Sequence, residues 1–162
     1  LEQGRIMAKP LTLPALKPDS VELRRETDYP GDYKDIVAGR VRRALGNALG
    51  LSQFGVNLVH LAPGAASAQR HWHAKEDEFV VVLSGAVTLI SDGGEQLLGA
   101  GDTAGFAAGV ADGHHLVNRG AEEAVYIEVG SRTADDVVDY PDIDLIYRRG
   151  EGMFTNKRGE SY

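Results

Sequence analysis

The stretch 64–85, GAASAQRHWHAKEDEFVVVLSG, places two histidines one residue apart and a glutamate five residues further on. On a β-strand, side chains at positions i and i+2 point to the same face. His71 and His73 can therefore direct two imidazoles at one point, and Glu78, at the start of the next strand, can add a carboxylate oxygen. Two imidazoles and a carboxylate suit a divalent transition metal with open coordination positions. The stretch is therefore predicted to form the first half of a metal site.

A second stretch, residues 101–118, reads GDTAGFAAGVADGHHLVN and adds further candidates. We expect a tight connection at Gly109 and Gly113, followed by a strand that carries His114 and Asn118. These two residues lie four positions apart and therefore face the same side of a strand. Asn118 is predicted to be structural, with its amide bonded to a turn or to the backbone near His114.

The size and composition of the chain favour a single all-β domain. The chain has 162 residues, which fits one domain that can bury a core of its own. It contains 20 glycines among 162 residues, or about 12%, whereas glycine makes up about 7% of an average protein. This excess indicates many tight turns, as in folds built from short strands.

Charge and cysteine content exclude several classes of protein. With 24 acidic and 17 basic residues, the net charge is −7, which argues against non-specific nucleic-acid binding and against docking on an anionic membrane. There are no cysteines, so disulfides and thiolate metal sites are excluded. No apolar run approaches the roughly 20 residues of a membrane helix, and the N-terminus lacks the pattern of a secretion signal. We expect a cytoplasmic protein without nucleic-acid or membrane partners.

From residue 54 onward the sequence has the pattern of short strands separated by glycine turns. Apolar or alternating runs are bounded by glycine-containing turns such as Asp92-Gly93-Gly94, which is a strong hairpin signal. The predicted strands cover residues 54–61, 78–83, 87–90, 95–98, 103–106, 114–118 and 124–129. Strands of this length and spacing indicate a β-sandwich or a small barrel.

The flanking segments are predicted to be arms on this barrel. Prolines interrupt helix formation in residues 1–35, which favours an extended arm. Residues 36–50 fit either a strand or a short helix with a turn at Gly46-Asn47, and their arginines are predicted to form a solvated face. The C-terminal segment is polar and irregular, and is expected to wrap the barrel or a partner subunit. We therefore divide the chain into an N-terminal arm with strands packing on the barrel, a barrel core and a C-terminal arm, at residues 1–50, 51–130 and 131–162.

The two stretches resemble the two sequence motifs of the cupin superfamily. The first motif has a glycine, His-x-His, a glutamate and a second glycine, which correspond here to Gly64, His71, His73, Glu78 and Gly85. The second motif corresponds to Gly101, Gly109, His114 and Asn118. Two departures affect the second motif: Ala107 replaces a proline, and four residues instead of two separate Gly109 from His114. The longer connection makes His115 an alternative to His114 as the ligand, and the spacing to Asn118 favours His114.

The resemblance covers roughly residues 54–130 and implies a fold, a cofactor and a ligand set. The fold is all-β, a single jelly-roll (double-stranded β-helix) barrel with the metal inside. The implied cofactor is a divalent transition metal such as Fe, Mn, Ni or Zn. Its implied ligands are His71, His73, Glu78 and His114. The arms are also similar to those of small bacterial cupins that pair as homodimers, so a homodimer is expected.

Several functions are compatible with this resemblance. Some cupins are sugar-phosphate isomerases, and this chain is similar to them, which makes isomerisation of a small polar substrate the first hypothesis. A phosphate group would need a cation, for which Arg40, Arg42 and Arg70 are candidates. Arg70 and His60 are further candidates for substrate contact, although His60 also fits a structural role. The alternatives are a metal-dependent dioxygenase or decarboxylase, or a cupin that binds a small ligand without turnover.

Three residues around the histidines receive structural predictions. Trp72 alternates with the two histidines and is predicted to pack on the opposite face of the strand. Glu76 and Asp77 are predicted to be solvated acids of a turn, with a second reading in which they orient a metal ligand.

Overall fold

The computed structural model describes residues 14–162, so the first part of the predicted N-terminal arm lies outside the described residues. Its largest sheet contains five antiparallel strands in the order β1-β2-β9-β4-β7. These strands span Arg40–Ala44, Phe54–Leu61, Ala124–Ser131, Glu78–Ser84 and Thr103–Phe106. Side chains alternate between the two faces along each strand, so Val80 and Val82 on β4 are buried while Phe79 and Leu83 are exposed.

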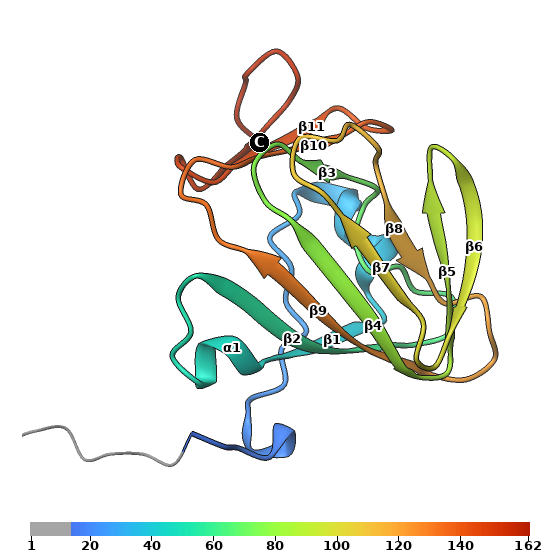
Figure 1. The fold of residues 1–162 in the computed structure, drawn as a ribbon. Coiled ribbons are helices and arrows are strands. Elements are labelled where there is room, and N and C mark those ends of the chain that lie inside the picture. Colours follow the sequence, from blue (N-terminus) through green and yellow to red (C-terminus); the bar gives the residue numbers. More distant parts are fainter. Residues whose placement is uncertain (1–13) are drawn as a thin grey trace, which may run out of the picture.

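A second sheet faces the first and closes the core. It has three antiparallel strands in the order β6-β5-β8, which span Gly94–Gly99, Ala86–Ser91 and His115–Val117 (Figure 1). Valine, leucine and tyrosine side chains from both sheets form one buried cluster, in which Val59, Val87 and Tyr126 are fully buried. The predicted all-β fold is confirmed, and the predicted strands of the barrel core correspond to β2 and β4–β9 with small shifts at their ends.

The C-terminal segment is not irregular, as the sequence pattern suggested, but forms a third sheet. Its strands β10, β11 and β12 span Val137–Tyr140, Leu145–Arg148 and Met153–Thr155. They pair in the order β12-β11-β10-β3, where β3 is the two-residue strand Trp72–His73. Val138, Tyr140 and Leu145 bury a small core of their own. These strands are so short that their apolar alternation is hidden between polar turns.

The N-terminal segment lies against both the five-stranded sheet and the C-terminal sheet. It contains two short 3-10 helices, η1 at Pro18–Ser20 and η2 at Gly31–Val37. Arg24 and Arg42 exchange backbone hydrogen bonds of 2.8 and 2.9 Å, which attach this segment to β1. Further along, Tyr29 packs edge-on against Tyr140 of β10, with ring centroids 5.7 Å apart. The N-terminal arm is therefore packed against β1 and β10.

Residues 36–50 contain both elements between which the sequence could not decide. Strand β1 ends at Ala44, and the helical turn α1, Leu45–Ala48, follows directly. No helix within the described residues has the length and apolar character that a membrane crossing requires.

Two glycines of the sequence motifs are required by the backbone. Gly85 turns the chain between β4 and β5 with φ of +70°, and a Cβ there would lie 2.7 Å from the Glu123 carbonyl oxygen. Gly109 has φ of +77° and donates its backbone N–H to the His73 carbonyl at 2.9 Å. Only glycine adopts such φ values without strain. Gly109 thereby ties the long connection before His114 to the strand that carries His73.

Candidate metal centre and adjoining cavity

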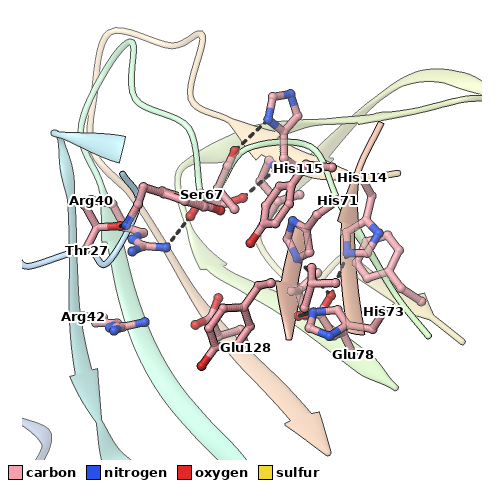
Figure 2. A pocket seen from close by; sticks show the side chains of 18 of the residues that line it. Thr27, Arg40, Arg42, Ser67, His71, His73, Glu78, His114, His115 and Glu128 are labelled. Atoms are coloured by element: carbon pink, nitrogen blue, oxygen red, sulfur yellow. Dashed lines mark hydrogen bonds and ion pairs between the residues drawn. The ribbon is translucent and has the colours of Figure 1, made fainter. Parts of the chain in front are cut away.

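The segment 71–78 and the distant residue His114 bring the predicted ligands together. His73 lies on β3, Glu78 is the first residue of β4, and His71 pairs its backbone with His114 in an antiparallel bridge. The two backbone hydrogen bonds of this bridge are 2.8 and 3.1 Å long. Figure 2 shows the four side chains pointing toward one another from these segments. The parity of His71 and His73 on one face agrees with the i, i+2 spacing of the sequence.

The three imidazoles converge on the Glu78 carboxylate through the same ring atom. The Nε2 atom of His114 lies 2.8 Å from Glu78 Oε2. The Nε2 atom of His71 lies 3.7 Å from Oε2, and that of His73 lies 3.5 Å from Oε1. The ring of Phe106 stacks on His114 with centroids 3.5 Å apart, which fixes the orientation of this imidazole.

The opposite ring nitrogen of each histidine has a hydrogen-bond acceptor outside the cluster. Nδ1 of His71 donates to the Gln69 carbonyl at 2.8 Å, and Nδ1 of His73 donates to Asp136 Oδ2 at 2.7 Å. Nδ1 of His114 has the Asp112 carbonyl as its acceptor at 3.4 Å. A proton held on Nδ1 leaves the Nε2 lone pair directed into the cluster. This tautomer is the one that a metal-ligating histidine needs.

The surroundings of the cluster favour the ionised form of Glu78 and the protonated form of His73. Burial raises the pKa of Glu78, but when Nε2 of the histidines is protonated as well as Nδ1, hydrogen bonds from His114, His71 and His73 outweigh burial and hold the pKa of Glu78 well below its ordinary value. Burial lowers the pKa of His73, yet the hydrogen bonds and negative charges of Glu78 and Asp136 raise it to about 9. A negative carboxylate surrounded by imidazoles therefore attracts a cation, either a proton or a metal ion.

The donor set and its spacing fit a transition-metal ion. Ligand atoms about 2.0–2.2 Å from one ion lie roughly 3–4 Å from one another. The ligand atoms of His71, His73 and Glu78 all lie within 4.8 Å of one another, and the distances to Glu78 range from 2.8 to 3.7 Å. Imidazole and carboxylate donors are those that Fe, Mn, Ni and Zn accept in proteins. The residues present therefore fit the group that the sequence motifs imply.

The structure separates His114 from its neighbour His115. His114 is buried and faces Glu78, whereas Nδ1 of His115 is directed to the Ala68 carbonyl at 2.9 Å. In Figure 2 the His115 ring lies apart from the other three histidines. The long connection from Val110 to Gly113 thus leaves His114 in the position that the spacing to Asn118 predicts. Asn118 itself is fully buried and donates to the Leu61 and Glu122 carbonyls, which confirms its predicted structural role.

The two candidates for additional substrate contacts are not brought to the cluster. His60 Nδ1 lies 2.8 Å from Glu123 Oε1. His60 is not among the residues that line the cavity beside the histidine cluster, which is described below. Arg70 forms a bidentate ion pair with Asp142. It also pairs with Asp92 and donates a hydrogen bond to the Gly113 carbonyl. Arg70 therefore ties three loops together, and among the described residues neither side chain lines that cavity.

Two buried carboxylates lie behind His73. The sequence did not single out Asp136, and it gave Glu76 a role in orienting a metal ligand only as a second reading. Asp136 has no exposed surface and accepts hydrogen bonds from His73 Nδ1 and from the backbone N–H of Lys75. Glu76 is only 3% exposed and accepts hydrogen bonds from the Thr133 backbone and from Arg149. The prediction of a solvated Glu76 is wrong, because the segments that carry Thr133 and Arg149 close over its carboxylate. Asp77 is exposed, as predicted.

The hydrogen bond of Asp136 predicts a loss of metal affinity in an isosteric variant. In Asp136→Asn, the amide oxygen can keep the hydrogen bond from the Lys75 backbone N–H, which places the amide NH₂ group next to His73 Nδ1. An NH₂ group is a donor, so the ring proton moves to Nε2 and blocks the lone pair that would bind the metal. We expect metal affinity to fall about 10–100-fold, the usual effect of losing such a partner. Competition with a chromophoric chelator for Zn²⁺ or Mn²⁺ measures this change.

Asp135→Asn is the matched control for this variant. Asp135 is adjacent in sequence but exposed, and it pairs with Lys75 at the surface. The metal affinity of the Asp135→Asn variant should equal that of the wild type. Equal affinity in Asp136→Asn as well would mean that Asp136 does not set the tautomer of His73.

A cavity of about 360 Å³ opens beside the cluster. This volume lies in the range of small-molecule sites, about 300–1,000 Å³. Its wall includes His71, His73, Glu78 and His114, together with aromatic side chains from both arms. A second cavity of about 250 Å³ lies against Trp72 and Phe106 and shares three of the four cluster residues. The cluster can therefore be reached by a small polar molecule.

The cavity wall also contains arginines that the sequence placed on a solvated face. Arg40 and Arg42 alternate on β1 and line the cavity, so that prediction is wrong for these two residues. Arg40 donates to the Ser67 carbonyl at 2.6 Å, whereas the Arg42 guanidinium forms no ion pair or hydrogen bond within residues 14–162. Burial and the neighbouring Arg40 lower the pKa of Arg42 below its ordinary value. An arginine in such surroundings is suited to bind an anion.

Two facing β-sheets that enclose three histidines and a glutamate are typical of one class of small β-barrel proteins, and comparison with known proteins identifies it. A family model described as Cupin domain matches residues 57–130. A sugar phosphate isomerase of the cupin superfamily from Silicibacter pomeroyi is 44% identical, with a TM-score of 0.88, over 92% of this chain and 96% of that chain. The chain belongs to the cupin superfamily, and the predicted jelly-roll fold is confirmed.

Other comparisons extend the likeness with less detail. A candidate sugar phosphate isomerase from Acidithiobacillus ferrooxidans is 35% identical, with a TM-score of 0.69, over 79% of this chain and 84% of that chain. A predicted oxalate decarboxylase from Thermotoga maritima has a TM-score of 0.58 at 17% identity, over 74% of this chain and 99% of that chain, and shares the fold alone. Among curated proteins, no sequence matches this chain.

Proposed function

We propose that this cupin is a metal-dependent isomerase that interconverts an aldose phosphate and a ketose phosphate. One observation carries the proposal: the same cavity is lined by the histidine–glutamate cluster and by the guanidinium of Arg42, which has no partner among residues 14–162. A sugar phosphate has the matching chemistry, with neighbouring oxygens at one end and a phosphate group further along. The names of the relatives from Silicibacter pomeroyi and Acidithiobacillus ferrooxidans support the same assignment.

The cluster provides the binding position for the reacting end of the substrate. In this proposal His71, His73, Glu78 and His114 hold the divalent ion. A bound ion would supply Lewis-acid polarisation of the substrate oxygens at C1 and C2. The hydrogen bonds from Nδ1 of the histidines to Gln69 and Asp136 keep the rings oriented before substrate arrives.

The arginines on β1 provide the binding position for the phosphate. Arg40 and Arg42 lie on the strand at one edge of the five-stranded sheet, while Glu78 begins β4 on the other side of β9. In Figure 2 the two arginines and the histidines accordingly lie on opposite sides of the view. This separation lets a sugar span the cavity, with its phosphate at β1 and its carbonyl end at the cluster.

Turnover of defined substrates tests the proposal. The full chain, loaded separately with Mn²⁺, Fe²⁺, Ni²⁺ or Zn²⁺, is incubated with a panel of three- to six-carbon aldose and ketose phosphates, and the products are identified by NMR. We expect isomerisation of at least one pair and no oxygen uptake. Absence of turnover with every sugar phosphate would contradict the isomerase assignment. Oxygen uptake or CO₂ release with other substrates would support the dioxygenase or decarboxylase hypothesis instead.

Recovery of an unchanged bound ligand without any turnover would support a binding protein. The expected homodimer stays a prediction, which sedimentation velocity of the full chain measures.

A further inference from the structure

A glutamate on the floor of the cavity is not used by the proposed metal site. Glu128 lies on β9 within the apolar run AVYIEVG, and it shares the inward face of this strand with Ala124 and Tyr126, which are fully buried. The carboxyl group therefore points into the cavity, whose lining includes it. Placing a carboxylate on an inward face costs free energy unless it is paired and hydrogen-bonded, and functional sites are where such a cost is commonly retained.

Neighbouring strands place Glu128 between the two ends of the proposed substrate. In the sheet register, Glu128 is opposite Val80 on β4, and Glu78 is opposite Gly130, so the two glutamates are diagonal neighbours on adjacent strands. Such neighbours are on the order of 7 Å apart. On its other side lies β2 and then β1, which carries Arg40 and Arg42. Figure 2 shows Glu128 between these arginines and Glu78.

The hydrogen bonding of Glu128 leaves part of its carboxylate open to a ligand. Asn57 Nδ2 donates to Glu128 Oε1 at 2.9 Å, and within the described residues the carboxylate accepts no other hydrogen bond. Two other carboxylates line the cavity. Glu78 is occupied by the three histidines, and Asp28 is exposed at the N-terminal arm.

We propose that Glu128 is the catalytic base that carries a proton between C1 and C2 of the substrate, an inference that rests on the proposed isomerase function. The Glu128 carboxylate removes the proton from C2, and the electron pair of that C–H bond forms a C1=C2 double bond while O1 takes up a proton. The same carboxylic acid then returns its proton to C1, while O2 loses its hydroxyl proton and becomes the carbonyl oxygen. The atoms of aldose and ketose are equal, so the step needs no oxidant or reductant.

The surroundings of Glu128 adjust its basicity in the required direction. Burial raises the pKa of Glu128 above its ordinary value and outweighs the hydrogen bond from Asn57 and the charges of Arg40 and Arg42, which lower it. The charge of Glu78 adds to the increase. A general base works best when its pKa approaches the working pH. Burial also raises the pKa of Tyr126 and Tyr140 well above the ordinary value, so both phenols stay protonated and unsuited to act as bases.

The isosteric variant Glu128→Gln tests the assignment. With the aldose phosphate that the metal-loaded wild type turns over, we expect kcat to fall about 100-fold or more, since a positioned acid–base group contributes 10²–10⁴-fold. Metal content by elemental analysis and the affinity for the corresponding alditol phosphate should be unchanged. Incorporation of deuterium from D₂O into recovered substrate, read by NMR, should be lost together with turnover.

Two further variants separate a proton carrier from a structural residue. Glu123→Gln makes the same chemical change just before β9 but outside the cavity, and should leave kcat unchanged. Asn57→Leu removes a hydrogen bond that lowers the pKa of Glu128, so the acidic limb of the kcat/KM profile should move to higher pH. A structural role for Glu128 would not move this limb.

The outcomes distinguish failure of the inference from failure of the proposed function. If the wild type isomerises a sugar phosphate and Glu128→Gln keeps more than about a tenth of its kcat, or continues to exchange deuterium, the assignment of Glu128 is wrong and the isomerase function stands. If the metal-loaded wild type neither isomerises nor exchanges deuterium with any sugar phosphate of the panel, the proposed function is wrong, and the role of Glu128 is wrong with it.

Discussion

Replacing His73 with alanine is expected to remove the metal from this protein while leaving the barrel folded. His73 supplies one of three Nε2 atoms around Glu78, and alanine leaves that position empty. Losing a direct ligand should weaken binding by more than the 10–100-fold that follows loss of an outer partner. Elemental analysis of the purified variant measures metal content, and circular dichroism with thermal unfolding measures the fold. Most of the barrel core should be unaffected, because it lies between the five- and three-stranded sheets and does not include His73.

His60→Ala is the matched control for the metal prediction. His60 lies on β2 and is bonded to Glu123, so the same chemical change outside the cluster should keep the metal content of the wild type. One result would contradict the metal site as a whole. If the wild type is purified without metal and added Mn²⁺, Fe²⁺, Ni²⁺ and Zn²⁺ all fail to bind, the three histidines and Glu78 do not form a metal centre.

The second large effect is expected from Arg42→Met, which removes a positive charge from the cavity and keeps an unbranched apolar stem in place of the arginine stem. A charge-assisted hydrogen bond contributes about 1.5–3 kcal/mol, and each 1.4 kcal/mol is a factor of ten. We therefore expect kcat/KM for the sugar phosphate to fall about 10- to 100-fold. The non-phosphorylated form of the same sugar should react equally slowly with the variant and the wild type, because it has no anion for Arg42 to bind.

Arg43→Met provides the comparison on the same strand. Arg43 bonds the Val21 carbonyl and pairs with Asp19, and it does not line the cavity. Its replacement should lower the stability of the N-terminal arm with little change in kcat/KM. If Arg42→Met also retains the kcat/KM of the wild type with the phosphorylated sugar, the phosphate does not bind at β1.

The sequence predicted the parts of the site that depend on short-range spacing. His71 and His73 share a face because strand side chains alternate, and Glu78 follows after a turn short enough to bring it back. The bridge between His71 and His114 connects residues from two separate motifs, and only the resemblance to a family indicated it. The spacing to Asn118 favoured His114 over His115, and the structure agrees: His114 faces Glu78, whereas His115 is bonded to the Ala68 carbonyl.

The missed residues depend on contacts that no local pattern encodes. Asp136 and its exposed neighbour Asp135 have identical side chains, and only the pairing of β10 with β3 buries one of them next to His73. Two other features left a local signal. Arg40 and Arg42 alternate in RVRRA and share a face if that segment is a strand, and Glu128 has the parity of the buried Tyr126 in AVYIEVG. An inward charge on a strand is the pattern to search for in a barrel of this kind.

The pairing of β3 with β10 would link metal binding at His73 to the folding of the C-terminal sheet. His73 lies on the two-residue strand β3, where it is opposite Val138 of β10. Its imidazole donates a hydrogen bond to Asp136, the residue just before β10. An ion that binds only when this sheet is in place adds its binding free energy to the stability of the sheet. An ion bound at His73 would therefore stabilise residues 131–162, and the protein without the ion should expose this segment to proteases before the barrel itself unfolds.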